Sequence, residues 1–173
     1  NETIFFMSNK KSVLEKHLYS VRFDGTALKL LTPEPGTHSV SMNPNGKTFI
    51  DTYSSIDQPR TIRFRSSDGT LIRTLGTTDL SNFDQTNLSK PSIVRFLADD
   101  NETILNGIVT LPHNYEEGKQ YPMIVHGYGM PGTQIVRNRW QGGFQQFLAK
   151  EGYIIFSMDA RGMSGRGRDF KNL

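Results

Sequence analysis

The strongest constraint on the fold of this chain is a pair of apolar runs separated by one helix-length segment. The first run, YPMIVH (121–126), breaks into the glycine-rich turn GYGMPG (127–132), and the second, YIIFSMDARG, covers 153–162. Residues 139–152 between them fit a helix that ends at a glycine. This strand–loop–helix–strand order predicts the start of a parallel α/β sheet, with the glycine-rich turn at the carboxyl end of its first strand.

The first half of the chain predicts a different architecture, because it contains only short β-prone segments separated by turn signals. The dipeptides Asp24-Gly25, Asn45-Gly46 and Asp68-Gly69 tolerate the positive φ of tight turns, so each predicts a hairpin. The polar stretch SNFDQTNLSKPS (81–92) predicts a linker. We therefore expect a mixed protein, an all-β domain over residues 1–88 followed by an α/β domain over 89–173. The expected strands of the first domain are ETIFFMSN, HLYSVRF, ALKLLT, HSVSMN, KTFIDTYSS, RTIRFRS and LIRTL.

The β-rich half also contains an internal repeat. RFDGTALKLL and RSSDGTLIRTL both run strand, Asp-Gly-Thr, strand, and Asp68 lies 44 residues after Asp24 (68 − 24). A period of about 44 is typical of four-stranded propeller blades. Two units alone do not distinguish a propeller from a plain β-meander.

Composition narrows the range of functions. The chain has no cysteine, and its net charge of +3 comes from 20 basic and 17 acidic residues that are interspersed. The cluster of Arg161, Arg166, Arg168 and Lys171 lies in a glycine-rich loop, so we expect no nucleic-acid partner. No apolar run approaches the roughly 18 residues that would span a bilayer. The four histidines lack metal-ligand spacing, so we expect no metal and no cofactor.

The turn at 127–132 matches the dinucleotide-binding string G-x-G-x-x-G, and an acid, Asp159, follows the next apolar run. Three features count against that interpretation. Asp159 lies 27 residues after Gly132 (159 − 132), where about 20 are expected. Pro131 and the residues before 139 separate the helix from the turn. A hairpin, predicted from IVRFLADD and TILNGIVTLP with its turn at 99–102, also precedes the strand.

The same residues suit stabilisation of an oxyanion. His126-Gly127-Tyr128-Gly129 resembles the HGGG-type loop of α/β-hydrolases, which follows a strand and contributes a donor to the oxyanion hole. Tyr128 would supply a phenolic O–H between two glycines that leave it uncrowded. The alternative is a packing tyrosine whose hydroxyl lies in solvent.

Ser164 is a poor candidate for the nucleophile. Gly162-Met-Ser164-Gly-Arg166 nearly fits G-x-S-x-G, but arginine replaces the last glycine. The nucleophile elbow also requires a strand directly before the serine and a helix directly after it, whereas five residues (159–163) separate Ser164 from the strand. We expect a loop serine.

Three stretches resemble the prolyl oligopeptidase family of serine peptidases, and most of all its dipeptidyl peptidase IV branch. They are LTPEPGTHSVSMNPNGKTFIDTYSSIDQP (31–59), LNGIVTLPHNYEEGKQYPMIVHGYGMPG (105–132) and SMDARGMSGRGRDF (157–170). The resemblance covers nearly the whole chain in order. It implies the last blades of a β-propeller, about two of them, followed by the N-terminal part of an α/β-hydrolase domain.

The resemblance also implies an activity and site residues. Such proteins release dipeptides from peptide N-termini, preferring proline or alanine at the second position, so the implied partner is a peptide substrate. Tyr128 matches the tyrosine whose hydroxyl helps to form the oxyanion hole. Asp159, Arg161 and Gly162 match a supporting D-x-R-G loop, and Gly127 and Gly129 flank the tyrosine. A periplasmic or extracytoplasmic location is implied by the resemblance only.

The catalytic triad is the main departure from the family pattern. In such proteins the serine, aspartate and histidine come later, so we expect this chain by itself to be inactive. The alternative is a noncatalytic β-rich binding module, since such families include inactive relatives. The strands at 122–126 and 153–158 are expected to lack neighbours, and exposed strands favour pairing with another copy. We therefore expect a homo-oligomer or a partly ordered chain.

Overall fold

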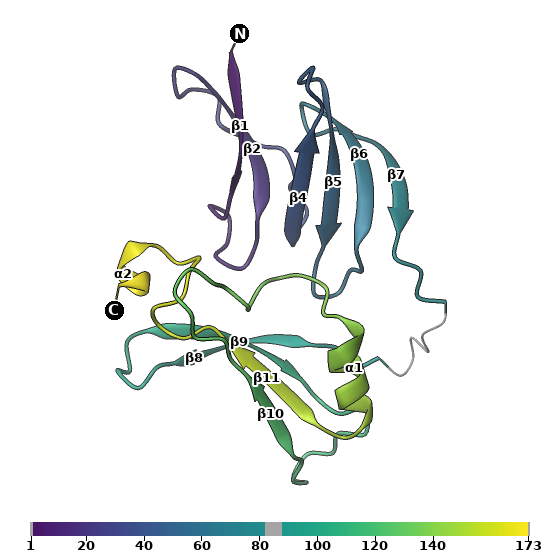
Figure 1. Cartoon of the computed structure of the whole chain (residues 1–173), viewed down its shortest axis with the longest axis vertical. Helices are drawn as coiled ribbons and strands as arrows, with labels where there is room; N and C mark the ends of the chain where they lie inside the picture. Colours follow the sequence, from purple (N-terminus) through teal and green to yellow (C-terminus); the bar gives the residue numbers. More distant parts are fainter. Residues whose placement is uncertain (1, 82–87, 173) are drawn as a thin grey trace. The chain divides into compact units, whose positions relative to one another are not determined.

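The computed structural model describes residues 2–81 and 88–172, and it is mostly β-sheet (Figure 1). It divides into two compact units. The first runs to Thr78 and includes Arg137–Trp140, and the second comprises Asp79–Val136 and Gln141–Leu173. Residues 82–87 of the predicted linker lie outside the described residues, and the domain boundary after residue 88 stays a prediction.

The first unit contains two antiparallel sheets. Their strand orders are β1-β2-β3 and β4-β5-β6-β7, and each strand pairs with its neighbour in the sequence. All seven β-prone segments form strands, although ALKLLT contributes only two residues. The strands of the first sheet are β1 (Thr3–Ser8), β2 (His17–Arg22) and β3 (Lys29–Leu30). Those of the second are β4 (Thr37–Met42), β5 (Thr48–Ser54), β6 (Thr61–Ser66) and β7 (Leu71–Thr77).

The predicted turns and the predicted repeat are both confirmed within the first unit. The three turn glycines have φ values of 80°, 69° and 93°, in the left-handed region that glycine enters at least cost. Asp24 Oδ1 accepts the backbone N–H of Thr26 at 2.9 Å, and Asp68 Oδ1 accepts that of Thr70 at 2.9 Å. Strands β1, β2 and β3 therefore correspond to β5, β6 and β7. Strand β4 has no counterpart in the first sheet as far as the described residues go.

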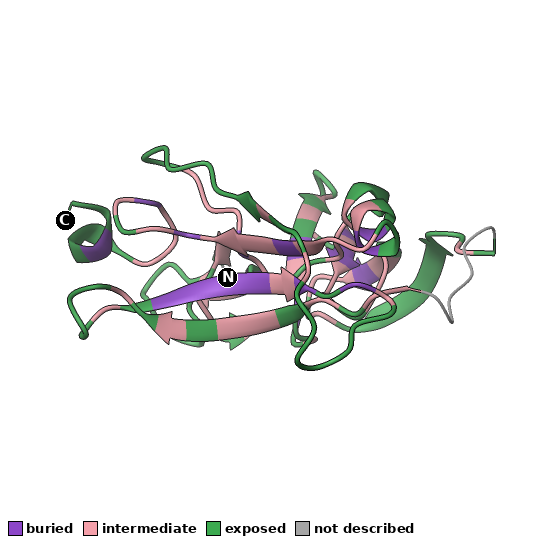
Figure 2. Ribbon diagram, turned by 90° about the horizontal axis from the view of Figure 1, so that it is seen from below, coloured by how far each residue is buried: buried purple, intermediate pink, exposed green. Residues whose placement is uncertain are grey.

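The core of the first unit combines apolar and polar side chains. Leu18, Leu31 and Phe49 form its apolar centre. In β5, Phe49, Asp51 and Tyr53 share one face and are all buried, as the two-residue period of a strand requires. Buried residues occupy short stretches between partly exposed and exposed ones (Figure 2).

A buried ionic network completes this core. The side chain of Asp51 is fully buried, and its carboxylate accepts a hydrogen bond from Arg65 Nε at 3.1 Å. His38 Nδ1 lies 2.9 Å from the other carboxylate oxygen. Arg65 also contacts the carboxylate of Glu34 and donates to the carbonyl oxygen of Gly69 at 2.9 Å. Every charge in the network therefore has an opposite partner, which burial requires.

The second unit contains a mixed sheet in the order β10-β11-β9-β8. Its parallel pair, β10 and β11, is joined through α1, which confirms the predicted strand–helix–strand unit. β11 also pairs antiparallel with β9, so the sheet is not purely parallel. The elements are β8 (Ser92–Leu97), β9 (Ile104–Thr110), β10 (Met123–His126), α1 (Gly143–Lys150), β11 (Ile154–Met158) and α2 (Arg168–Lys171).

The helix was predicted from residue 139, and the prediction is wrong about where it starts. It begins at Gly143, because the segment 137–140 is hydrogen-bonded within the first unit. Its end is as predicted, since Gly152 follows the last turn with φ 88°. The Gly152 N–H donates to the carbonyl oxygen of Ala149 at 3.2 Å.

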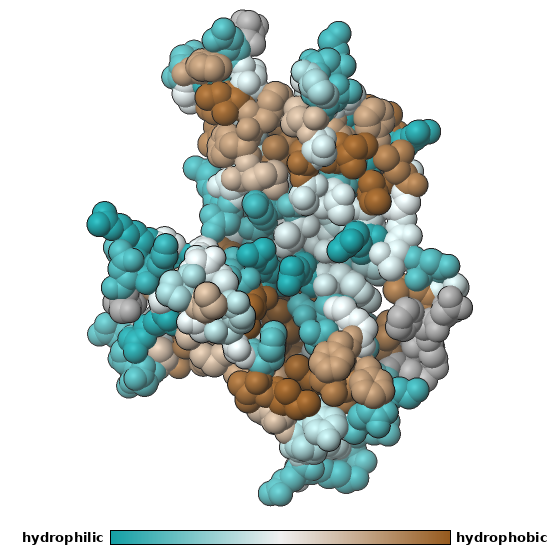
Figure 3. All heavy atoms as spheres, in the orientation of Figure 1, coloured by the Kyte–Doolittle hydropathy of each residue, from teal (hydrophilic) through white to brown (hydrophobic). Residues whose placement is uncertain are grey.

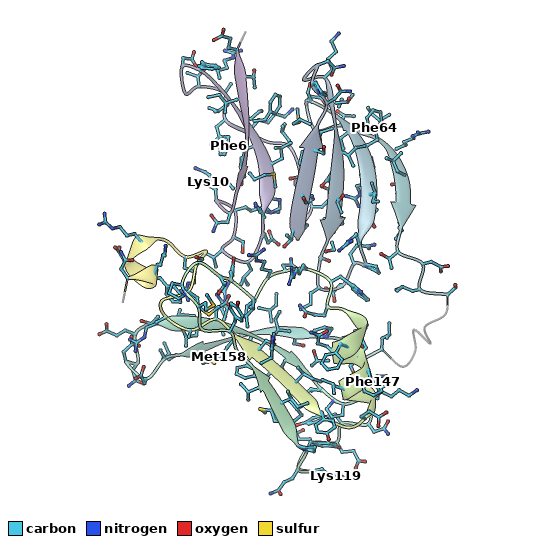
Figure 4. The ribbon with its side chains drawn as sticks, in the orientation of Figure 1. Phe6, Lys10, Phe64, Lys119, Phe147 and Met158 are labelled. Carbon is cyan, nitrogen blue, oxygen red and sulfur yellow. The ribbon has the colours of Figure 1, made fainter. Side chains whose placement is uncertain are left out.

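The expectation that both strands of the parallel pair lack neighbours is wrong for β11, and β10 lacks a neighbour on one side only. β11 lies between β10 and β9, whereas β10 is an edge strand of the described sheet. Hydrophobic side chains reach the surface on β10 and α1, including Val125 at 62% and Phe147 at 56% exposure (Figures 3 and 4). The homo-oligomer therefore stays a prediction, one that now concerns β10 alone.

Candidate functional site

The parallel pairing of β10 and β11 places two candidate loops at the same edge of the sheet. His126 is the last residue of β10 and lies opposite Ser157 of β11 in the register. Tyr128 follows two residues after the first strand, and Asp159 directly follows the second. Because the carboxyl ends of neighbouring parallel strands meet at one edge, the topology brings together the two loops that were singled out from the sequence.

Tyr128 lies in an open part of the first loop. Its side chain is 56% exposed. Gly129 has φ 66°, a conformation that disfavours other residues, and Gly127 has open space where a Cβ would be. The phenol is therefore free of crowding by its neighbours in the sequence. This arrangement suits a hydroxyl that must reach a bound molecule.

Asp159 connects the second loop to the first. It is only 4% exposed. Its carboxylate accepts the backbone N–H of Ile135 at 2.8 Å and that of Val136 at 3.2 Å. Val136 is fully buried, so its N–H has no access to water and needs this acceptor. Asp159 thus holds the far end of the loop that begins at Gly127.

Ser164 belongs to the same set of contacts between the two loops. Its backbone N–H donates to the carbonyl oxygen of Thr133 at 2.8 Å. Ser164 follows the end of β11 by six residues (164 − 158) and α2 begins only at Arg168, so no strand runs into the serine and no helix follows it directly. The structure agrees with the prediction of a loop serine.

Arg161 connects the second loop to the hairpin between β8 and β9. Its guanidinium donates to Asp100 Oδ2 at 2.8 Å and to Asp99 Oδ1 at 3.0 Å. Hydrogen bonds from the Thr103 hydroxyl, and then from the backbone N–H groups of Thr103 and Glu102, lower the pKa of Asp100, with a smaller contribution from Arg161. The Asp100 carboxylate therefore stays ionised well into the acid range, and its ion pair with Arg161 persists there.

Gly162 makes the turn of the same loop possible. Its φ is 86°, and its N–H donates to the carbonyl oxygen of Phe170 at 2.9 Å. Sequence reasoning identified the turn at 99–102 and the loop residue Arg161 but not their pairing. The side chains are 61 and 62 residues apart, and no local signal connects them.

The structure counts further against a dinucleotide site. α1 begins at Gly143, which lies 11 residues after Gly132 (143 − 132). No helix N-terminus therefore follows directly on the glycine-rich turn, as a bound pyrophosphate requires. In the described residues, no group of three or more histidine, cysteine or acidic side chains is arranged to hold a metal ion.

No helix in the described part of the chain is both long and apolar enough to cross a membrane.

Comparison with known proteins supports the resemblance. Residues 1–60 match the model of the dipeptidyl peptidase IV N-terminal region. A probable dipeptidyl-aminopeptidase B of Emericella nidulans is 31% identical over 95% of this chain and 19% of its own length. A second such protein, from Arthroderma benhamiae, is 28% identical over 99% of this chain and 19% of its own length. The chain thus spans about a fifth of the length of these curated relatives.

A solved structure shows the same fold. The crystal structure of Porphyromonas gingivalis dipeptidyl peptidase 4 matches with a TM-score of 0.88 at 24% sequence identity, over 98% of this chain and 24% of that one. At this identity the likeness concerns the fold alone. It supports the arrangement of strands in both units described above.

Proposed function

We propose that the chain is part of a serine-type exopeptidase of the dipeptidyl peptidase IV branch of the prolyl oligopeptidase family, because it is similar over nearly its whole length to dipeptidyl-aminopeptidases. The full protein would release dipeptides from peptide N-termini by way of an acyl-enzyme. In this proposal the first unit forms propeller blades and the second begins the α/β-hydrolase domain.

The blade assignment is supported by the repeat of 44 residues and by the order of the strands. The sheet β4-β5-β6-β7 is a four-stranded antiparallel meander, as a propeller blade is. The sheet β1-β2-β3 repeats the last three strands of that pattern. The hydrolase assignment is supported by the parallel pair β10 and β11 with α1 between them, because parallel strands with helical crossovers are typical of α/β folds.

The observation that carries the proposed mechanism is the position of Tyr128 at the carboxyl end of β10. In acyl transfer, negative charge builds on the former carbonyl oxygen of the substrate, and a donor already in place stabilises it. We assign that donor to the Tyr128 hydroxyl. Asp159 and Arg161 act indirectly. Asp159 holds the loop that carries Tyr128, and Arg161 holds the loop that follows β11 on the β8–β9 hairpin.

The nucleophile, the acid and the base of the triad are proposed to lie in another part of the full protein. The 173-residue chain should accordingly show no turnover of an alanyl-proline p-nitroanilide. Ser164→Ala is the matched variant for that assay. Turnover by the purified chain that disappears in Ser164→Ala would contradict the assignment of Ser164 as a loop residue.

The sequence that follows Leu173 in the full protein distinguishes the peptidase from a noncatalytic binding module. A G-x-S-x-G motif followed by an aspartate and a histidine supports the peptidase. A substituted serine in that motif would instead favour a protein that only binds its partner.

A further inference from the structure

The open ends of β8 and β9 bring two polar segments of the second unit together. Ser89 and Lys90 lie shortly before β8, and His113 lies shortly after β9. Because these strands are antiparallel, with Ser92 opposite Val109, the start of one and the end of the other meet at the same edge of the sheet. The Ser89 hydroxyl oxygen lies 2.8 Å from His113 Nδ1 and joins the two segments.

This edge is opposite to the one that carries the candidate site. Thr110, the last residue of β9, pairs with Ile155 near the start of β11. Tyr128 instead follows the end of β10, which runs parallel to β11. The Ser89–His113 pair therefore lies at the N-terminal edge of the parallel strands, and the proposed peptidase mechanism makes no use of it.

An open pocket lies between the two segments. Its volume is about 300 Å³, at the lower end of the range for small-molecule sites. Its lining comes from residues 88–90 and 111–115. Every polar side chain in these ranges can donate a hydrogen bond and none is acidic: Ser89, Lys90, His113, Asn114 and Tyr115. The lining therefore suits a negatively charged group.

Helix α1 fixes the serine side of the pocket. Gln146 is only 8% exposed, and its Oε1 accepts the backbone N–H of Ser89 at 2.9 Å. Its Nε2 donates to the carbonyl oxygen of Ser89 at 2.8 Å. Ser89 cannot turn away without leaving this buried amide unpaired, so its position is set before any ligand arrives.

The hydroxyl of Tyr121 fixes the histidine side. It donates to the carbonyl oxygen of Asn114 at 2.9 Å and accepts the backbone N–H of Glu116 at 2.9 Å. The ring of Tyr115 packs on that of Tyr121, with 5.4 Å between the centroids. The backbone after His113 is thus held in a turn. A pocket formed in advance on both sides binds with a smaller cost in ordering its groups.

The pair of Ser89 and His113 keeps a donor for a ligand in either histidine tautomer. If the hydroxyl donates to Nδ1, the ring carries its hydrogen on Nε2, and that N–H is left over. If Nδ1 donates to the hydroxyl oxygen, the O–H is left over. Within the described residues neither side chain makes another hydrogen bond.

Lys90 adds a positive charge to these donors. Its ammonium group forms no ion pair or hydrogen bond with any residue that the structure describes. Glu116, the acid that follows the lining residues in the sequence, is itself paired with Lys119 at 2.7 Å. An ammonium group without an acidic partner, next to further donors, attracts an anion.

We propose that the pocket lined by residues 88–90 and 111–115 binds a small oxyanion, a phosphate or carboxylate group. Lys90 supplies the charge, and the pair of Ser89 and His113 supplies a further donor. The inference goes beyond the proposed peptidase function, because it concerns the opposite edge of the sheet from Tyr128.

Calorimetric titration of the full-length protein that carries this sequence with inorganic phosphate tests the site. Ionic strength is held constant with sodium chloride, so that screening of surface charges does not change. Lys90→Met should raise the Kd about tenfold, the scale of one lost charge-assisted hydrogen bond, and Lys90→Arg should keep most of the affinity. Lys150→Met, at an exposed position in the last turn of α1, is the matched control and should leave the Kd unchanged.

Three results of this titration would overturn the proposal. They are no phosphate binding by the wild type, an unchanged Kd in Lys90→Met, and an equal loss in Lys90→Met and Lys150→Met. The last of these would show that phosphate responds only to overall charge.

Amide hydrogen exchange locates the bound anion. Saturating phosphate should slow exchange in peptides that cover 88–90 and 111–116, and Lys90→Met should abolish this protection. Acetate in place of phosphate separates the two ligand sources, since protection by both supports a general oxyanion pocket and protection by phosphate alone supports a phosphate site. Protection only elsewhere in the protein would overturn the proposal. Neither measurement uses turnover, so the result stands whether or not the full protein is a peptidase.

Discussion

The carboxylate of Asp159 accepts the backbone N–H of Val136, and this bond joins the loop after β11 to the loop after β10. Both residues are buried, Asp159 at 4% exposure and Val136 at 0%. The contact makes the two loops a single structural unit at the carboxyl edge of the sheet. The following predictions concern this unit and the network that supports the first unit.

Asp159→Ala should destabilise the second unit. It leaves the N–H groups of Ile135 and Val136 without their acceptor, at a cost of about 1–3 kcal/mol for each buried donor that stays unpaired. Urea unfolding followed by circular dichroism measures the loss. Glu117→Ala at an exposed position is the control and should stay within about 0.5 kcal/mol of the wild type. Equal urea midpoints for Asp159→Ala and Glu117→Ala would contradict the inference that Asp159 joins the two loops.

The two Asp-Gly turns of the repeat should respond differently to the same substitution. Gly25 and Gly69 both have positive φ, so an alanine is strained at either position by about 1–2 kcal/mol. A Cβ at Gly25 meets open space, whereas at Gly69 it would lie 2.5 Å from the carbonyl oxygen of Leu31. Gly69→Ala should therefore lower the free energy of unfolding further than Gly25→Ala does, by about 1–3 kcal/mol more.

Arg65→Met should be among the most damaging substitutions in the first unit. Arg65 is 3% exposed and pairs with the fully buried carboxylate of Asp51. Removing one partner of a buried pair costs about 3–5 kcal/mol, because the remaining charge is uncompensated. Arg73→Met on the exposed strand β7 is the matched control. Equal Tm values for Arg65→Met and Arg73→Met would show that the buried carboxylate of Asp51 tolerates the loss of its Arg65 partner.

The acid stability of the β6–β7 turn should depend on Asp68. The Ser66 hydroxyl, followed by the N–H and hydroxyl of Thr70, lowers the pKa of Asp68 from 3.8 to about 2. Because the pKa of Asp68 is lower in the folded chain than in the unfolded chain, its ionised carboxylate stabilises the folded state. This contribution is present above about pH 4 and is lost as the pH falls through about 2. A carboxyl ¹³C titration measures the pKa directly. In Ser66→Ala it should move back toward 3.8, and an unchanged titration would contradict the stated cause.

Local signals predicted the strands and turns of the first unit well, because an Asp-Gly turn requires only its own residues. The start of α1 was predicted wrongly at Arg139 for the opposite reason. Residues 137–140 are bonded to groups far away in the sequence, such as Thr37, which lies 101 residues before Asn138. The pairing of Arg161 with Asp99 and Asp100 likewise depends on tertiary placement. Tyr128 and Asp159 were found because glycines and strand ends mark such loops locally.

The most direct test of the central claim is the turnover of alanyl-proline p-nitroanilide by the full-length protein that carries this sequence, compared with its Tyr128→Phe variant. Removal of one oxyanion donor should lower kcat by about 10²–10³-fold with little change in KM. Tyr121→Phe is the matched control, since its hydroxyl accepts the backbone N–H of Glu116 and donates to the carbonyl oxygen of Asn114 within its own turn. A Tyr128→Phe enzyme as fast as the wild type would contradict the assignment of Tyr128.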